Sequence, residues 1–328
     1  MEEIMKRRIE GIQFGELQVH NHVAIIPLIG ANGAGPIYLT MKEAMEDRLL
    51  VVTELTEGGT VPELKVLNKA ERPVLLLDGE ELAGAKQNRV LNTTILLREK
   101  SETVIPVSCT EHGRWSYSSS QFEASGHIMS AKLRRVKNES VAENLKTACG
   151  FRSDQGAVWD EIAAQAAENK VSPITGAMRD VLDAKQEDLD AFLERFPVIP
   201  DQNGLFVMVN GKVVGLDMVS STAAFGILHP KLIRSYVMDA LTEKPKKGKE
   251  ANRGKADTFL SEILTCEEHT FNSVGYGRDY RYEGKKIVGS ALVHEGTVIH
   301  MAFFQITETE KAGRMQSVSR RRGYRTNQ

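Results

Sequence analysis

The sequence is poor in cysteine and has no long apolar run. Its three cysteines, Cys109, Cys149 and Cys266, are odd in number and far apart in the 328 residues. A disulfide framework is therefore not expected, and a reducing compartment suits such a chain. No apolar stretch approaches the roughly 18 residues that a membrane helix needs, and the first residues lack the apolar segment of a signal peptide. These absences predict a cytoplasmic protein with no membrane partner.

The sequence also lacks the spaced motifs of common ligand sites. It contains neither the GxxxxGK[ST] of a phosphate-binding loop nor the GxGxxG of a dinucleotide fold. Its eight histidines show no spacing that would bring three or four ligands onto a zinc ion. We therefore predict no metal site, and the motifs leave any cofactor unidentified.

The net charge of −2 conceals two basic segments. Residues 244–255 hold six basic residues and one acidic residue, and residues 311–328 hold six basic residues and no acidic one. The rest of the chain carries 30 basic and 43 acidic residues, so the folded body is a poor platform for nucleic acid. The tail could contact RNA or an acidic partner, or could be a solvated segment that keeps the protein soluble. The sequence does not indicate an oligomeric state.

The hydrophobic pattern predicts an α+β fold. Short apolar runs with polar turns indicate a β-rich region over residues 21–120, either a sandwich or a barrel-like layer. Residues 121–200 have helical periodicity, and residues 201–306 combine helices with a second antiparallel hairpin layer. We expect one elaborate domain over 21–306, preceded by an N-terminal segment, 1–20. The stretch 244–255 is predicted to be a flexible basic insertion, and 307–328 a disordered basic tail.

Several turns and helix starts have clear local signals. Thr40 and Glu43 have the spacing of a capping box at a helix start. Asn210–Gly211, between two apolar runs, is a strong hairpin signal, and Glu295–Gly296 is predicted to turn a second hairpin. Pro230 is predicted to occupy the first position of a helix that begins at His229.

The most unusual polar segment is GEELAGAKQNR, residues 79–89, which follows an apolar run. The carboxylate of Glu80 could act as a base. Lys86 and Arg89 could hold a phosphate or carboxylate, Arg89 in bidentate fashion. Gln87 and Asn88 could contact a base or ribose edge. The alternative is a hairpin loop whose charges satisfy one another.

A second polar segment, CTEHGRW, covers residues 109–115 at the end of a predicted strand. Cys109 followed five positions later by Arg114 resembles loops that hold a thiolate nucleophile beside an arginine, and His112 could lower the pKa of the thiol. The residues that follow do not indicate the helix start that such loops use. The alternative is a buried, inert cysteine with Glu111 and its neighbours on a polar rim.

Four segments together resemble one known family: PVLLLDGEELAGAKQNRV, IPVSCTEHGRW, SDQGAVWDEI and GLFVMVNGKVVGLD. It is the ARG and rhodanese-phosphatase-superfamily-associated protein domain family, in which ARG stands for ADP-ribosylglycohydrolase. The resemblance runs from about Arg8 to Phe304, and the basic stretch 244–255 looks like an insertion. The family name describes the proteins that its genes accompany. The resemblance therefore implies a component of NAD or ADP-ribose metabolism in prokaryotes, and no particular reaction.

Carried over by position, the resemblance points to nine residues: Glu80, Lys86, Gln87, Asn88, Arg89, Cys109, Glu111, Arg114 and Trp159. In our first hypothesis, loops 79–89 and 109–115 form a pocket for a small phosphate-bearing ligand, either a nucleotide or an ADP-ribose-like molecule. The cations and Trp159 would bind it, the amides would orient ribose or base, and Glu80 or Glu111 would be the general base.

Two further hypotheses remain open. In the second, the protein is a Cys109-dependent sulfur- or phosphoryl-transfer enzyme. In the third, it is a non-enzymatic binding or scaffold domain, in which the polar loops stabilise the fold through salt bridges among themselves. The sequence alone does not decide whether the protein is an enzyme.

Overall fold

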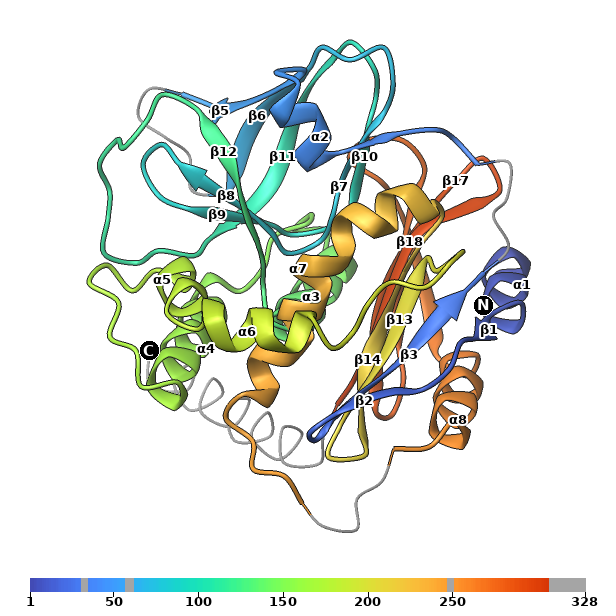
Figure 1. Cartoon of the computed structure of the whole chain (residues 1–328). Coiled ribbons are helices and arrows are strands. Elements are labelled where there is room, and N and C mark those ends of the chain that lie inside the picture. The colour runs from blue at the N-terminus through green and yellow to red at the C-terminus, as the bar shows by residue number, and fades with distance from the viewer. Residues whose placement is uncertain (31–34, 57–61, 247–250, 307–328) are drawn as a thin grey trace, which may run out of the picture.

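The structure is a computed structural model that describes residues 1–30, 35–56, 62–246 and 251–306 (Figure 1). The predicted disordered tail and part of the predicted basic insertion lie outside these residues. The described chain forms a closed six-stranded barrel, a nine-stranded antiparallel sheet, a small three-stranded sheet and a set of helices. The predicted α+β class is confirmed, with its β-rich first half, helical middle and second antiparallel layer.

The barrel is built from one continuous part of the chain and encloses its own hydrophobic core. Alternate side chains of its strands, such as Val52, Val66, Leu82 and Val107, fill the interior. Around the barrel the strands follow the order β11, β6, β5, β12, β8, β9. Their bounds are β5 Leu50–Glu54, β6 Glu63–Asn68, β8 Glu80–Gly84, β9 Arg89–Leu91, β11 Ser101–Cys109 and β12 Phe122–Ile128.

The small sheet lies beside the barrel and contains β4 Leu39–Thr40, β7 Val74–Leu76 and β10 Ile95–Leu97. The helix α2, Met41–Glu46, begins directly after β4. The predicted capping box is confirmed there, because the Thr40 hydroxyl accepts from the Glu43 backbone N–H at 3.3 Å. In return, the Glu43 carboxylate accepts from the Thr40 backbone N–H at 2.8 Å.

The large sheet joins the two ends of the described chain. Its strand order is β1, β3, β13, β14, β18, β17, β16, β15, with β2 paired to β3. Both predicted hairpins are confirmed, and Asn210 and Gly211 have the positive φ values, 49° and 65°, that a tight hairpin turn favours. The bounds are β1 Gln13–Phe14, β2 Gln18–His20, β3 Val23–Ile29, β13 Gly204–Val209, β14 Lys212–Val219, β15 Glu267–Asn272, β16 Arg278–Glu283, β17 Ile287–His294 and β18 Thr297–Gln305.

Helices cover both faces of the large sheet (Figure 1). The helices α1 Glu3–Glu10 and α8 Gly254–Ile263 bury Met5, Ile9 and Phe259 against one face. The other face packs on the remaining helices, and this second core continues to the barrel through Leu77 and Val90. These helices are α3 Ala131–Lys146, α4 Gln155–Glu168, α5 Met178–Asp183, α6 Gln186–Leu193 and α7 Thr222–Ala240. Among the described residues, no helix has both the length and the apolar character needed to cross a bilayer.

The start of α7 differs from the sequence prediction. The helix begins at Thr222, two turns before His229, and Pro230 lies inside it. Ser221 is the N-cap, and its hydroxyl accepts from the Ala224 backbone N–H at 3.2 Å. A proline inside a helix removes one backbone hydrogen bond and is normally unfavourable. Here the burial of Phe225 and Leu228 before the proline, and of Leu232 after it, explains why the helix continues.

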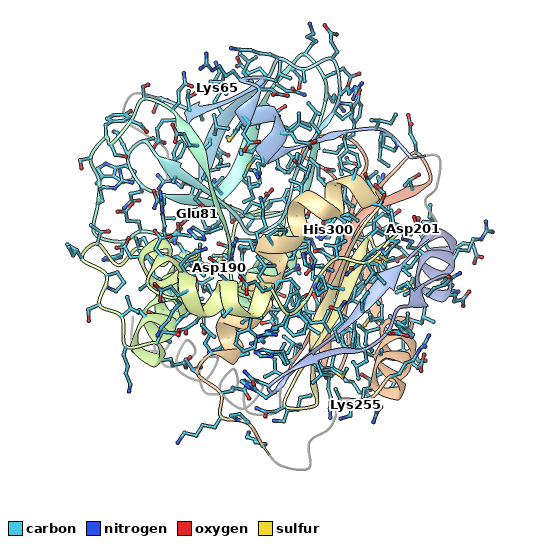
Figure 2. The ribbon with its side chains drawn as sticks, viewed as in Figure 1. Lys65, Glu81, Asp190, Asp201, Lys255 and His300 are labelled. Atoms are coloured by element: carbon cyan, nitrogen blue, oxygen red, sulfur yellow. The ribbon has the colours of Figure 1, made fainter. Side chains whose placement is uncertain are left out.

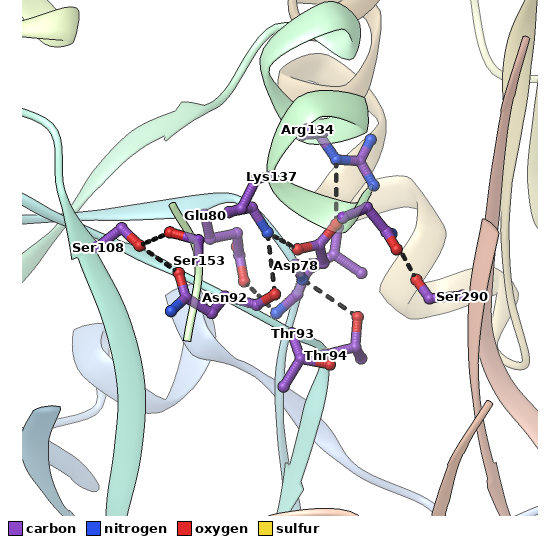
Figure 3. A network of polar contacts seen from close by, with 12 residues as sticks. Asp78, Glu80, Asn92, Thr93, Thr94, Ser108, Arg134, Lys137, Ser153 and Ser290 are labelled. Carbon is purple, nitrogen blue, oxygen red and sulfur yellow. Dashed lines mark hydrogen bonds and ion pairs between the residues drawn. The ribbon is translucent and has the colours of Figure 1, made fainter. Parts of the chain in front are cut away.

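A buried set of charged side chains joins the barrel to the sheet (Figure 3). Arg134 of α3 forms a bidentate pair with Asp217 of β14, with N–O distances of 2.8 and 2.6 Å. The neighbouring Lys137 contacts Asp78, which follows β7. We call the following residues, each at most 5% exposed, the interface network: Asp78, Glu80, Arg134, Lys137, Asp217, Lys231, Asp279 and Arg281.

Side chains of His300 and Tyr236 extend the interface network through hydrogen bonds. His300 of β18 accepts or donates at both ring nitrogens, to Thr94 at 2.8 Å and to Asp217 at 3.0 Å. The Tyr236 hydroxyl donates to Asp217 at 2.7 Å. Figure 2 shows His300 and Glu81 inside the body of the molecule, whereas Lys65 lies at its edge. The network therefore fixes the barrel on the sheet and holds one end of β8 in place.

Candidate functional site at one end of the barrel

Three polar side chains point into one end of the barrel, which we call the barrel mouth. Strand residues two positions apart lie on the same face. Arg89, Cys109 and Glu54 therefore share a face with the interior residues Leu91, Val107 and Val52, respectively. Two loops, residues 85–88 and 110–121, lie at this end of the barrel, and Arg114 of the second loop donates to the Ala85 oxygen of the first. The predicted loops 79–89 and 109–115 thus meet here.

Arg89 is the central charge of the barrel mouth. Its side chain is fully buried, and its Nη1 donates to the backbone oxygen of Gln87 at 3.3 Å and to its side-chain Oε1 at 3.1 Å. Its Nη2 lies 3.9 Å from Glu54 Oε1, which is an ion pair but too long for a hydrogen bond. Within the described residues, Arg89 Nε and Nη2 and Glu54 Oε2 have no hydrogen-bond partner. A buried polar group without a hydrogen-bond partner costs free energy, so each of these groups calls for an explanation.

Lys86 lies at the rim against two aromatic rings. Its ammonium is 5.5 Å from the ring centre of Trp115 and 5.1 Å from that of Tyr117. The Trp115 ring also lies over the guanidinium of Arg89, with Cζ 5.7 Å from the ring centre. Trp115 therefore covers the one fully buried cation of the mouth, and Lys86 extends the positive charge to the surface. With Glu54 as the inward-facing carboxylate, these side chains carry a surplus of one positive charge.

Arg114 anchors the loop 110–121 and has an internal role. Its guanidinium donates to the backbone oxygens of Ala85 at 2.7 Å and Ser116 at 2.9 Å. It also donates to Asn88 Oδ1 at 3.2 Å and forms an ion pair with Glu111 at 2.7 Å. These contacts use most of its donors, so Arg114 holds the two loops together.

Glu111 completes this anchor. It accepts from the Arg114 Nε at 2.9 Å, the Thr175 hydroxyl at 2.8 Å and the Asn88 backbone N–H at 3.2 Å. Burial alone would raise the pKa of Glu111, but these hydrogen bonds and the charge of Arg114 lower it below the ordinary value. A carboxylate with a lowered pKa is a weak base. The geometry therefore supports a structural role for Glu111 more than the predicted role of general base.

The close contact between the two loops requires glycine at position 84. The φ of Gly84 is 124°, a value that other residues rarely adopt. A Cβ at this position would lie 2.6 Å from the Ser119 hydroxyl and 2.8 Å from the Gln121 backbone oxygen. The glycine thus lets the loop that carries Trp115 and Tyr117 pack directly on the end of β8.

Cys109 is buried in the mouth, opposite Arg89 in the barrel ladder. Its side chain is 1% exposed, and burial raises the pKa of its thiol despite the nearby charge of Arg89. The Gln155 amide brackets the Cys109 backbone, accepting from its N–H at 2.7 Å and donating to its carbonyl at 2.9 Å. Reactive cysteines have lowered pKa values and partial exposure, and Cys109 has neither.

The two carboxylates at the start of β8 lie in different surroundings. Glu80 is at the end of the strand away from the mouth, where it contacts Lys231 and accepts from the Leu77 backbone N–H at 2.7 Å. Glu81 points to the outside of the barrel and accepts from the Thr110 hydroxyl at 2.7 Å. Burial raises the pKa of Glu81 to about 7. The structure therefore does not bring Glu80 together with the other predicted site residues.

Trp159 lines a separate apolar groove. Its ring packs edge-to-face on His112, with ring centres 4.4 Å apart. The groove has a volume of about 570 Å³ and is lined by α4 and the loop around Pro173. His112 is the link to the mouth, because it lies between Glu111 and Arg114 in the chain. Trp159 is therefore adjacent to the mouth and not part of it.

The structure thus brings seven of the nine predicted residues together: Lys86, Gln87, Asn88, Arg89, Cys109, Glu111 and Arg114. Sequence reasoning missed Glu54, Trp115 and Tyr117 as members of the site. The signal for Tyr117 was present, since an aromatic residue between serines is typical of an exposed loop. Among the described residues, no three His, Cys, Asp or Glu side chains are grouped so as to hold a metal ion.

Comparison with known proteins gives one match. The family model of the ARG and Rhodanese-Phosphatase-superfamily-associated Protein domain matches residues 11–304. No curated protein and no solved structure matches the chain.

Proposed function

The chain belongs to this ADP-ribosylglycohydrolase-associated family, and we propose that its barrel mouth binds a phosphate-bearing ligand, either a nucleotide or an ADP-ribose-like molecule. The observation that carries the proposal is Arg89. It is fully buried, it has two nitrogens without a hydrogen-bond partner in the described residues, and Lys86 stands beside the same Trp115 ring. A phosphate would supply acceptors for the two Arg89 nitrogens and would also attract the Lys86 ammonium.

The chemistry of the mouth fits a phosphate better than a carboxylate alone. A guanidinium presents several N–H donors in a fixed plane, which suits phosphate oxygens, and a lysine adds a mobile point charge. The rest of the folded body is acidic, so a local positive surplus is needed for any anionic ligand. In this proposal the side chains of Lys86 and Trp115 rotate on an otherwise fixed loop to admit the phosphate to Arg89, and the protein acts in NAD- or ADP-ribose-linked metabolism.

Calorimetric titration with ADP-ribose, NAD and AMP tests the proposal. We expect at least one of these ligands to bind the wild-type protein. Lys86→Gln and Arg89→Lys should each weaken binding about 10-fold or more, the effect of losing one charged hydrogen bond. Arg89→Lys keeps the charge beside Glu54 and loses only the planar fork.

Arg98→Gln is the matched control. Arg98 also lies over an aromatic ring, that of Tyr276 at 5.1 Å. It is outside the mouth, because its backbone oxygen accepts from Asn68, which pairs with Ser101 at the opposite end of β11 from Cys109. It should bind like the wild type. Absence of heat with all three ligands, or equal losses in the mouth variants and the control, would contradict the proposal.

The other two hypotheses from the sequence gain less support. The buried, weakly acidic thiol of Cys109 does not favour a thiolate nucleophile at neutral pH. The Arg114–Glu111 pair does what the scaffold hypothesis expects, because it stabilises the loops through internal contacts. That hypothesis does not explain the two Arg89 nitrogens that have no hydrogen-bond partner in the described residues.

A further inference from the structure

Two aromatic side chains are exposed beside the barrel mouth. Trp115 is 49% exposed and Tyr117 is 52% exposed. Within the described residues, every other Phe, Tyr and Trp side chain is more buried than these two. Exposed aromatic rings cost solvation free energy, and when they are grouped they commonly mark a binding surface.

We infer that Trp115 and Tyr117 hold the base of the ligand, so that the site recognises a nucleotide and not a sugar phosphate alone. The inference rests on the proposed function, because it assigns a second part of the same ligand. Both ring centres lie within 5.5 Å of one ammonium, that of Lys86. The two rings therefore both lie beside the Lys86 ammonium, where a flat group could replace it.

Lys86 is suited to give up this space to a base. Its ammonium is on a flexible four-carbon stem, and a cation–π contact near the surface is weaker than the stacking of a base on an aromatic ring. The base would therefore replace the ammonium over the rings, and Lys86 would turn to the phosphate that Arg89 also contacts.

Hydrogen bonds within the chain hold the loop that carries the rings. Ser118 donates its backbone N–H to the Ala85 oxygen at 2.9 Å, and Arg114 donates to the Ser116 oxygen at 2.9 Å. The Ala85 backbone N–H donates to the Ser119 hydroxyl at 3.0 Å. The residue after each ring, Ser116 after Trp115 and Ser118 after Tyr117, is thus held by one of these hydrogen bonds. A preorganised loop reduces the entropic cost of binding.

The experiment compares ADP-ribose with ribose 5-phosphate, which has a phosphate and no base. By calorimetry, we expect the wild type to bind ADP-ribose more tightly. Trp115→Leu and Tyr117→Leu should each weaken ADP-ribose binding about 5- to 150-fold and leave ribose 5-phosphate binding unchanged.

Two control variants separate stacking from folding. Tyr117→Phe keeps the ring and should bind ADP-ribose like the wild type. Tyr276→Leu removes a ring that lies under Arg98 elsewhere and should also have no effect. Circular dichroism checks that each variant is folded.

The outcomes distinguish the two proposals. If ribose 5-phosphate binds as tightly as ADP-ribose, or the leucine variants weaken both ligands equally, the stacking inference is wrong and the proposed phosphate site stands. If neither ligand binds, the proposed function fails, and the inference that rests on it fails with it.

Discussion

The barrel mouth and the interface network are both clusters of charged side chains, but their charges are matched differently. The interface network contains four carboxylates and four cations, and every member is at most 5% exposed. In the mouth, Arg114 and Glu111 neutralise each other, whereas Arg89 has only the long 3.9 Å ion pair with Glu54 among the described residues. Charges that hold a fold together are balanced within the protein, whereas a surplus of one sign at an accessible rim is available for a ligand.

Two pKa values in the interface network show how strongly its buried charges depend on one another. Burial alone would raise the pKa of Asp217, but Arg134 and His300 hold it well below the usual range. Burial lowers the pKa of Lys137 to about 8, although Asp78 partly offsets this. Each charge in the network therefore depends on its partner, and removal of a single partner should be costly.

The largest effect is expected for Asp217→Asn. Asp217 accepts two hydrogen bonds from Arg134 and one from Tyr236. Its loss leaves the buried guanidinium with only Asp78, which is 3.8 Å away and already paired with Lys137. We expect the free energy of unfolding to fall by about 3–5 kcal/mol, as measured by urea denaturation. Glu3→Gln, which removes an exposed ion pair with Arg7, should change it by less than about 0.5 kcal/mol. If the two substitutions lower the free energy of unfolding equally, burial does not determine how much an ion pair contributes to stability.

The next effect concerns Glu81, which supports the mouth through Thr110. Its pKa rises from 4.5 to about 7 because of burial, with Arg179 and Asp183 nearby. Between these pH values the folded protein holds a proton that the unfolded chain releases, so the free energy of unfolding should fall as the pH rises. The full shift corresponds to about 3 kcal/mol.

Glu81→Gln should remove this pH dependence. Urea denaturation at pH 4.5 and pH 8 should show the variant gaining up to about 3 kcal/mol relative to the wild type at the higher pH. The amide oxygen can still accept from the Thr110 hydroxyl, so the local contact is kept. If the free energies of unfolding of wild type and variant differ by the same amount at both pH values, Glu81 ionises normally.

The smallest effect on stability is expected for Arg114→Lys. A lysine keeps the charge near Glu111 but cannot reach Ala85, Ser116 and Asn88 at once, because it lacks the planar fork. We expect a loss of about 1–2 kcal/mol in urea denaturation and faster proteolysis within residues 115–121. The exposed Arg7→Lys serves as the matched control. If proteolysis of this loop is unchanged, Arg114 is not its anchor.

Local signals in the sequence predicted much of the fold and most of the mouth. The capping box at Thr40 and the Asn210–Gly211 turn depend on neighbouring residues, and both are present. The two polar segments could be predicted to meet because each lies at the end of a strand. Gly84 and Arg89 needed only their own segment to be noticed.

The parts of the fold and of the site that were not predicted depend on contacts between residues far apart in the sequence. The pair Arg134–Asp217 joins residues 83 positions apart, and neither segment shows an unusual local pattern. The start of α7 was misplaced because tertiary packing outweighed the unfavourable Pro230. Glu80 and Glu81 were both plausible site residues, and only the direction of β8 and its neighbours separated them.

The order of the strands also has a consequence for how the molecule is made. All six barrel strands lie between Leu50 and Ile128, so the barrel can close without any later residue. Strand β3 ends at Ile29, but its neighbour β13 does not begin until Gly204. Closing so long a loop costs entropy that only the finished contact repays. Strand β3 is therefore made before any barrel strand, but its neighbour β13 is made only after all of them.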